Sequence, residues 1–193
     1  MSRYPSVEYF CISKFTLFLA LFIIISASFT RQIMDFIKAS TGEKGFFYLI
    51  ATMVGILGLF FLICAIRNSY RLVKVLIFVV IWSIGLVLTW QIEIPEERIH
   101  ILEYAVLGWF SVKDLNRKSK KVRASFLACV YCVIVGILDE LFQAILPYRF
   151  FDWRDIIFNG VGGGWGVVLH LLSRGVYPVP RRKPSPLFLE RTG

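Results

Sequence analysis

Two groups of polar side chains interrupt stretches of sequence that are otherwise apolar. In the first group, His100, Glu103 and Tyr104 are spaced i, i+3 and i+4, so on a helix they share one face. If this helix lies in a membrane, each charged group costs roughly 2.5–3.5 kcal/mol on insertion scales. Such residues usually pair with one another or face a cavity, so they mark a candidate functional site.

The second group contains two neighbouring acids. Asp139 and Gln143 are spaced i, i+4, and Glu140 lies about 100° round the helix from Asp139. Both acids fall near the carboxyl end of the predicted helix, where the helix dipole disfavours negative charge. A binding or catalytic role explains their position better than helix capping does, and pairing within the bundle is the structural alternative.

A third set of polar residues follows Pro147. Asp152 can cap the next helix, and Asp155 then falls at its third position. Asp155 and Asn159 are spaced i, i+4 and share a face. The two aspartates are equally well explained as caps alone, and Arg149 can pair with a nearby acid or with a lipid phosphate.

These residue types suit acid–base chemistry or recognition of an anion. His100 or Glu140 could serve as the general base or acid, and Arg149 could meet a phosphate through two parallel hydrogen bonds. The sequence predicts no cofactor and no metal site, although carboxylate oxygens could hold a divalent cation that bridges to a phosphate. No nucleophile is evident, because no serine or cysteine falls near the cluster.

The composition places these residues in a membrane protein. The 193 residues are 57% hydrophobic and 18% charged, with a mean hydropathy of +0.68. Soluble domains carry roughly 45–50% apolar and about 25% charged residues, so the excess apolar surface must face lipid. The net charge of +9 does not indicate a nucleic-acid binder, because the basic residues lie almost wholly between the apolar runs.

The apolar runs predict an all-α, polytopic membrane helix bundle with about six transmembrane helices. The first run is interpreted as a retained span, although Ser26-Ala27-Ser28 could pass as a signal-peptide cleavage site. The fourth is short and could be tilted or partly submerged. The expected runs are 15–30, 45–66, 72–92, 98–112, 124–146 and about 153–174. They divide the chain into three N-terminal helices in 1–92, a three-helix region in 93–174 and a flexible basic cytoplasmic tail in 175–193.

The distribution of basic residues predicts the topology. With six spans, sixteen of the 22 Lys and Arg residues fall on the side of the two termini and six on the other. The positive-inside rule therefore places both termini in the cytoplasm and all three polar groups at the outer face of the membrane.

The last apolar run is rich in glycine. Gly160 with Gly164 and Gly162 with Gly166 both match G-x-x-x-G, a pattern that lets a neighbouring helix approach closely. These four glycines are therefore predicted to pack against another helix. Packing explains these glycines better than a phosphate-binding loop does, because no strand precedes the glycines and no Lys-Ser/Thr follows them.

Residues 95–172 resemble the VanZ-like membrane proteins. The stretch from Glu97 to Gly108 is similar to the first motif of that family, in which a charged pair precedes His, with Tyr four residues later and then Leu-Gly. The second motif is matched by Asp-Glu-x-x-Gln, Pro-x-Arg and Asp-x-x-x-Asn-x-x-Gly. Its residues here are Asp139, Glu140, Gln143, Pro147, Arg149, Asp155, Asn159 and Gly162. Glu96-Glu97-Arg98 stands where the family has an acidic residue and Lys.

The resemblance implies a multi-pass protein of a bacterial or archaeal inner membrane. The family is named for a protein that confers low-level resistance to teicoplanin, an antibiotic that targets cell-wall precursors. The expected partners are therefore membrane lipids and an anionic or lipid-linked component of the cell envelope.

Four functions remain open at this stage. The first is binding of such a component at the outer face, and the second is an acid–base enzyme that acts on a phospholipid or polyprenyl phosphate. The third is a small transporter, which requires polar residues along the whole bundle, and the second and third spans offer few. The fourth is a non-catalytic assembly factor.

Overall fold

The computed structural model describes residues 12–68, 72–92, 95–116, 121–147 and 149–173. The expected cytoplasmic tail, 175–193, lies outside these residues. Within them the chain is all helical, with five helices and no strand. The helices are α1 (Lys14–Asn68), α2 (Leu72–Trp90), α3 (Pro95–Leu115), α4 (Lys121–Ala144) and α5 (Trp153–Ser173).

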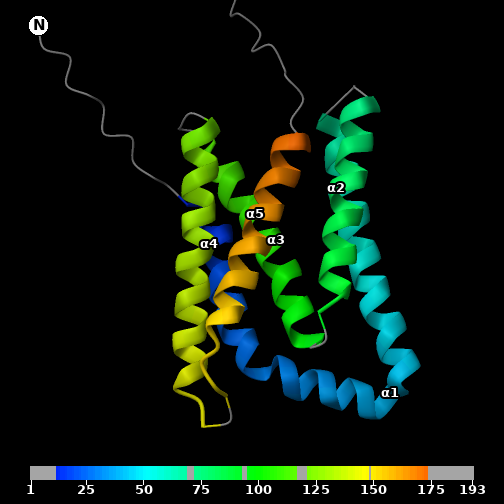
Figure 1. Cartoon of the computed structure of the whole chain (residues 1–193), viewed down its shortest axis with the longest axis vertical. Coiled ribbons are helices and arrows are strands. Elements are labelled where there is room, and N and C mark those ends of the chain that lie inside the picture. The colour runs from blue at the N-terminus through cyan, green and yellow to red at the C-terminus, as the bar shows by residue number, and fades with distance from the viewer. Residues whose placement is uncertain (1–11, 69–71, 93–94, 117–120, 148, 174–193) are drawn as a thin grey trace, which may run out of the picture.

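Helix α1 contains both of the first two predicted apolar runs. Its 55 residues are interrupted at Gly42, where φ of 71° and ψ of 172° break the helical geometry. Glycine populates this positive-φ region without steric cost, which suits the sharp turn. Figure 1 shows α1 descending, running across the lower end of the molecule and turning upward after the break. The described residues therefore form five helices where the sequence predicted about six, because the stretch between the first two runs is itself helical and joins them into α1 across the break at Gly42.

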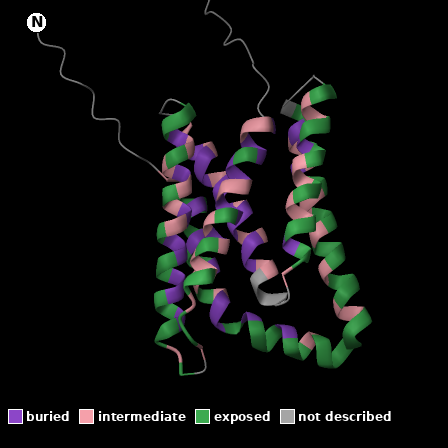
Figure 2. Ribbon diagram, in the orientation of Figure 1, coloured by how far each residue is buried: buried purple, intermediate pink, exposed green. Residues whose placement is uncertain are grey.

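Four of the five described helices, α1, α2, α4 and α5, are long and apolar enough to cross a membrane. Helix α3 is more polar, and it lies at the centre of the bundle (Figure 1). Its Tyr104, Ala105, Leu107 and Val112 are fully buried. The helices around α3 expose large apolar side chains, and Figure 2 shows exposed residues along α1, α2 and α4. The bundle thus surrounds its most polar helix with a surface suited to lipid.

Helices α3 and α5 approach closely because glycines of α5 face the backbone of α3. A Cβ added at Gly162 would lie 2.5 Å from the Ile101 carbonyl oxygen, and one at Gly166 would overlap the carbonyl of Ala105. On the facing helix, a Cβ at Gly108 would overlap the carbonyl oxygen of Gly163. Only one of the two G-x-x-x-G pairs, Gly162 with Gly166, therefore makes the α3–α5 contact.

The other predicted glycines lie on different faces of α5. A Cβ at Gly160 would touch Val133 of α4 at 3.3 Å, which is tight but not prohibitive. The prediction that Gly164 packs against a helix is wrong, because a Cβ there would meet no atom within 4 Å. Gly163, which the sequence analysis did not assign to packing, faces Cys132 of α4, with 2.5 Å from the added Cβ to the Cys132 Cβ.

The contrast between Gly166, which faces the backbone of α3, and Gly164, which faces open space, gives a stability prediction. Gly166→Ala should lower the free energy of unfolding by about 3 kcal/mol or more, because overpacking against backbone cannot be relieved by a side-chain rotation. Gly164→Ala should leave stability unchanged or raise it slightly, since alanine favours a helix. Thermal unfolding of both purified variants in detergent measures this, and equal midpoints would contradict the packing described.

Candidate functional site

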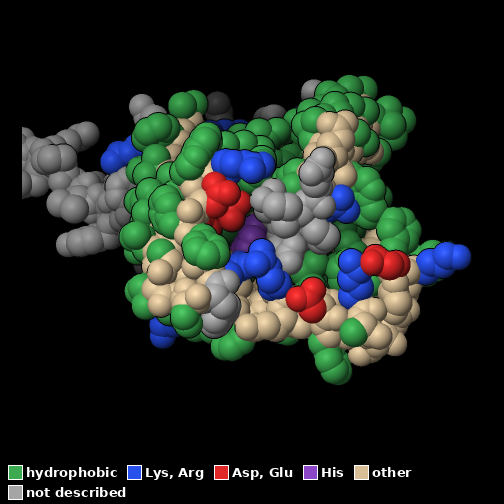
Figure 3. Space-filling view, turned by 60° about the horizontal axis from the view of Figure 1, so that its bottom comes forward, with side chains coloured by type: hydrophobic (Ala, Val, Ile, Leu, Met, Phe, Trp, Pro, Cys, Tyr) green, Lys and Arg blue, Asp and Glu red, His purple; other side chains and the backbone are tan. Residues whose placement is uncertain are grey.

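The predicted polar residues gather at one end of the bundle, called here the site end. It is the end at which α2 and α4 finish and α3 and α5 begin (Figure 1). Figure 3 looks onto this end and shows acidic, basic and histidine side chains together between hydrophobic ones. Three consecutive helices, α3, α4 and α5, thus contribute polar groups to one end of the bundle.

Asp139 lies at the centre of the cluster and is fully buried. The Tyr104 hydroxyl donates to its Oδ2 at 3.4 Å, and Gln143 Nε2 donates to its Oδ1 at 3.1 Å. The His100 Nδ1 stands 4.0 Å from the same Oδ2. Asp139 of α4 therefore connects to two residues of α3, and the two motif regions meet in space.

His100 stands between two carboxylates. Its Nδ1 is 3.5 Å from the Glu103 Oε2, and it is 4.0 Å from Asp139 on the other side. The His100 side chain is buried, whereas that of Glu103 is 23% exposed. Neither His100 Nδ1 nor Glu103 Oε2 has a hydrogen-bond partner among the described residues. A proton held between these groups would let His100 carry charge in the site.

Glu140 has a structural part in the site. Its Oε1 accepts from Gln143 Nε2 at 3.3 Å, and its Oε2 accepts from the backbone N–H of Asp152 at 3.0 Å. The second bond ties the end of α4 to the residue just before α5. This accounts for an acid at the carboxyl end of α4, and it shows Gln143 serving both buried acids at once.

Arg149 joins the connection between α4 and α5 to helix α1. Its Nη2 donates to the carbonyl oxygen of Ala27 at 3.3 Å. Its Nε is buried and has no hydrogen-bond partner within the described part of the chain. Asp152, next along the connection, caps α5 as expected, because its Oδ1 accepts from the backbone N–H of Arg154 at 2.8 Å. Arg149 is thus anchored with donor capacity left over.

Asp155 and Asn159 contribute more unpaired atoms. Asn159 is 1% exposed and packs near Gly136 of α4, yet both its Oδ1 and its Nδ2 lack a partner in the described structure. The Oδ1 of Asp155 is also buried and has no hydrogen-bond partner among the described residues. Leaving such a group unsatisfied costs about 1–3 kcal/mol, so these atoms need water or a ligand.

The arrangement does not form a preassembled metal site. Among the described residues there is no group of three or more His, Cys, Asp and Glu side chains placed to hold a metal ion. A divalent cation at this place would therefore need additional oxygen ligands, and a bound phosphate could supply some of them.

Sequence reasoning missed a second polar contact at the opposite end of the bundle. Asp114 accepts from the Thr16 hydroxyl at 2.7 Å and from the backbone N–H of Ser13 at 3.0 Å, so it secures the start of α1. His170 of α5, also unassigned, is buried with its ring 5.0 Å from that of Trp109. The adjacent Lys113 made Asp114 resemble a loop residue, and only the three-dimensional contact reveals its role.

A family model described as VanZ/LLP1 matches residues 6–174. The chain belongs to the VanZ/LLP1 family. The match includes the N-terminal helices, which the motifs in residues 95–172 did not cover, and every residue of the polar cluster lies within it. No curated protein and no solved structure matches this VanZ/LLP1 chain.

Proposed function

We propose that this VanZ/LLP1 membrane protein binds the anionic head group of a cell-envelope component in its polar cluster. One observation supports this above the others. Six buried polar atoms of five residues at the site end have no hydrogen-bond partner among the described residues, and two of them, His100 Nδ1 and Glu103 Oε2, face each other at 3.5 Å. They are His100 Nδ1, Glu103 Oε2, Arg149 Nε, Asp155 Oδ1, and the Oδ1 and Nδ2 of Asn159.

The cluster separates into a structural part and a receptive part. Asp139 and Glu140 are held by Tyr104, by Gln143 and by the backbone of Asp152, so their hydrogen bonds are largely used. The groups with spare capacity include the donor Arg149, which suits phosphate. The spare carboxylate oxygens of Glu103 and Asp155 would repel an anion unless a proton or a divalent cation lies between them.

The proposed location is the plasma membrane, with six crossings. The two parts of α1 on either side of Gly42 each contain a predicted apolar run, and with α2 to α5 they give an even number of passages. Both termini then lie in the cytoplasm and the site end faces outward, in keeping with the basic residues counted above. The helical stretch before Gly42 then lies along the outer interface.

Cysteine labelling tests this topology. Ser40 is exposed on α1 at the site end, and Lys121 is exposed at the opposite end, where α4 begins. In a cysteine-free background, Ser40→Cys should react with a membrane-impermeant maleimide in intact cells. Lys121→Cys should react only after permeabilisation, and the reverse pattern would mean that the site end faces the cytoplasm.

The function itself is tested by complementation in cells that lack the gene. At matched protein levels, His100→Ala, Asp139→Asn, Glu140→Gln and Arg149→Ala should each lose at least tenfold of the tolerance to a glycopeptide antibiotic that the wild type restores. Glu43→Gln is the control, because Glu43 is 77% exposed and pairs with Lys38 on the surface, away from the polar cluster. Full activity in all four cluster variants would contradict the proposal and mean that these polar residues only pair with one another within the bundle.

A second candidate is an acid–base enzyme acting on a phospholipid or polyprenyl phosphate. The position of His100 Nδ1 between two carboxylates, at 3.5 and 4.0 Å, favours it, because such a group can accept and return a proton. Turnover of either lipid by the purified protein, abolished by His100→Ala, would select this candidate over simple binding.

A further inference from the structure

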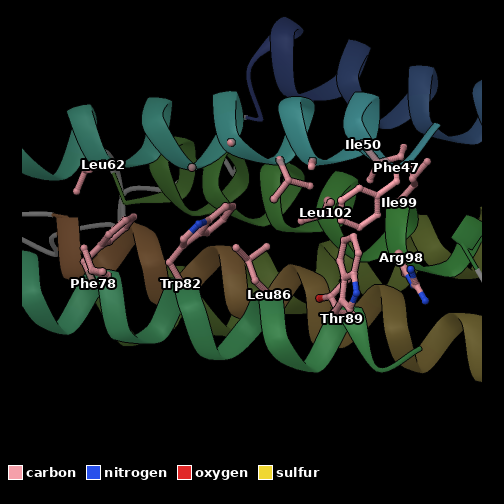
Figure 4. Close-up of a pocket in the computed structure, with 16 residues that line it drawn as sticks. Phe47, Ile50, Leu62, Phe78, Trp82, Leu86, Thr89, Arg98, Ile99 and Leu102 are labelled. Carbon is pink, nitrogen blue, oxygen red and sulfur yellow. The ribbon is translucent and has the colours of Figure 1, made fainter. Parts of the chain in front are cut away.

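An apolar groove runs beside the polar cluster, between the second part of α1 and helices α2 and α3. Its volume is about 560 Å³, within the range of roughly 300–1,000 Å³ that is typical of ligand pockets. Figure 4 shows Leu62 and Phe78 at one end and Phe47, Ile99 and Arg98 at the other, with Trp82 and Leu86 between them. Thr89 and Arg98 are the polar side chains of this otherwise apolar lining.

The charged end of the groove lies at the site end of the bundle. Arg98 donates from Nε to the Ile92 carbonyl oxygen at 2.7 Å, and its guanidinium carbon lies 5.0 Å from the Trp90 ring centre. These contacts hold the guanidinium at the mouth while its terminal nitrogens retain donors for a phosphate. A hydrocarbon chain in the groove would therefore carry its anionic head toward Arg98.

A second, smaller cavity lies beside the groove and brings Glu103 next to it. This cavity of about 240 Å³ between α1 and α3 shares four lining residues with the groove and is also lined by Glu103. The Glu103 carboxylate is in turn 3.5 Å from His100. Helix α3 thus contributes Ile99 and Leu102 to the groove and His100 and Glu103 to the polar cluster, so the two sites share one helix.

The length of the groove indicates what kind of chain it fits. Along α2 its lining extends from Phe78 to Trp90, and a helical rise of 1.5 Å per residue makes this about 18 Å. The hydrocarbon of one leaflet is about 15 Å deep, half of the roughly 30 Å core. An ordinary acyl chain matches this depth, whereas a polyprenyl chain is several times longer and would leave most of its carbons outside.

We propose that the groove holds one acyl chain of an anionic phospholipid, with its phosphate at Arg98 and next to the polar cluster. This names a ligand class for the site and rests on the proposed head-group function. Gly55 provides a way to close the groove. It lines the groove, and a Cβ added there would meet no atom within 4 Å, so a larger side chain would enter the groove without disturbing the helices.

Quenching of tryptophan fluorescence tests the proposal, since Trp82 and Trp90 line the groove. The full chain in detergent is titrated with phosphatidylglycerol that carries brominated acyl chains. Saturable quenching is expected for the wild type, with at least tenfold weaker affinity in Gly55→Phe. Gly164→Phe is the matched control, because Gly164 also has open space around it, and it should bind as the wild type does. Arg98→Gln should remove most of the preference for phosphatidylglycerol over phosphatidylcholine.

Three results would overturn the groove assignment. They are equal affinities of Gly55→Phe and the wild type, equal binding of both lipids by the wild type, and displacement by a polyprenyl phosphate at lower concentration than by phosphatidylglycerol. If Gly55→Phe binds normally while the cluster variants lose complementation, the groove proposal fails and the head-group proposal stands. If Gly55→Phe loses the lipid while the cluster variants complement fully, the groove stands and the head-group proposal fails.

Discussion

Polar groups placed at membrane depth must find partners inside the protein, because hydrocarbon offers none. In this bundle the requirement centres on Asp139, which is fully buried on α4 and receives hydrogen bonds from Tyr104 and Gln143. The same glutamine serves Glu140, whose other oxygen accepts from the backbone at Asp152. These bonds join α3, α4 and the start of α5, so the position of the site follows from satisfying two buried acids.

The close approach of α5 to its neighbours makes this arrangement possible. Gly162 and Gly166 bring α5 against carbonyls of α3, while Gly163 admits Cys132 of α4. With α5 held there, Asp155 and Asn159 lie near the start of that helix, but Asp155 Oδ1 and both side-chain polar atoms of Asn159 receive no hydrogen bonds from the described residues. A bundle built only for stability would fill such positions with apolar side chains, because an unpaired buried group lowers stability. Proteins commonly tolerate such a loss of stability at functional sites.

The sequence contained enough information to predict the helices and the gathering of polar groups at one end. Long apolar runs fix where helices lie, and alternating direction brings the starts of α3 and α5 to the end of α4.

The helical stretch before Gly42 was missed because its charges resemble those of a loop, although they suit a helix lying at the membrane interface. Gly164 was misassigned because closely spaced glycines cover every face of α5, and only the rotation of that helix decides which of them touch a neighbour. The pairing of Gln143 with both acids likewise depends on side-chain placement. The six crossings and the cytoplasmic termini stay predictions.

The central claim is that the unpaired atoms of the cluster serve a ligand and not the stability of the fold. It is tested most directly by the free energy of unfolding of Asn159→Leu in bicelles, since leucine is close in size and asparagine makes no side-chain hydrogen bond within the described residues. The account predicts a stability equal to the wild type or up to about 2 kcal/mol higher, whereas the control Gln143→Leu should lose about 1–3 kcal/mol, because Asp139 Oδ1 and Glu140 Oε1 both lose their donor. A loss in Asn159→Leu as large as that in Gln143→Leu would mean that Asn159 is a structural partner, and it would contradict the claim.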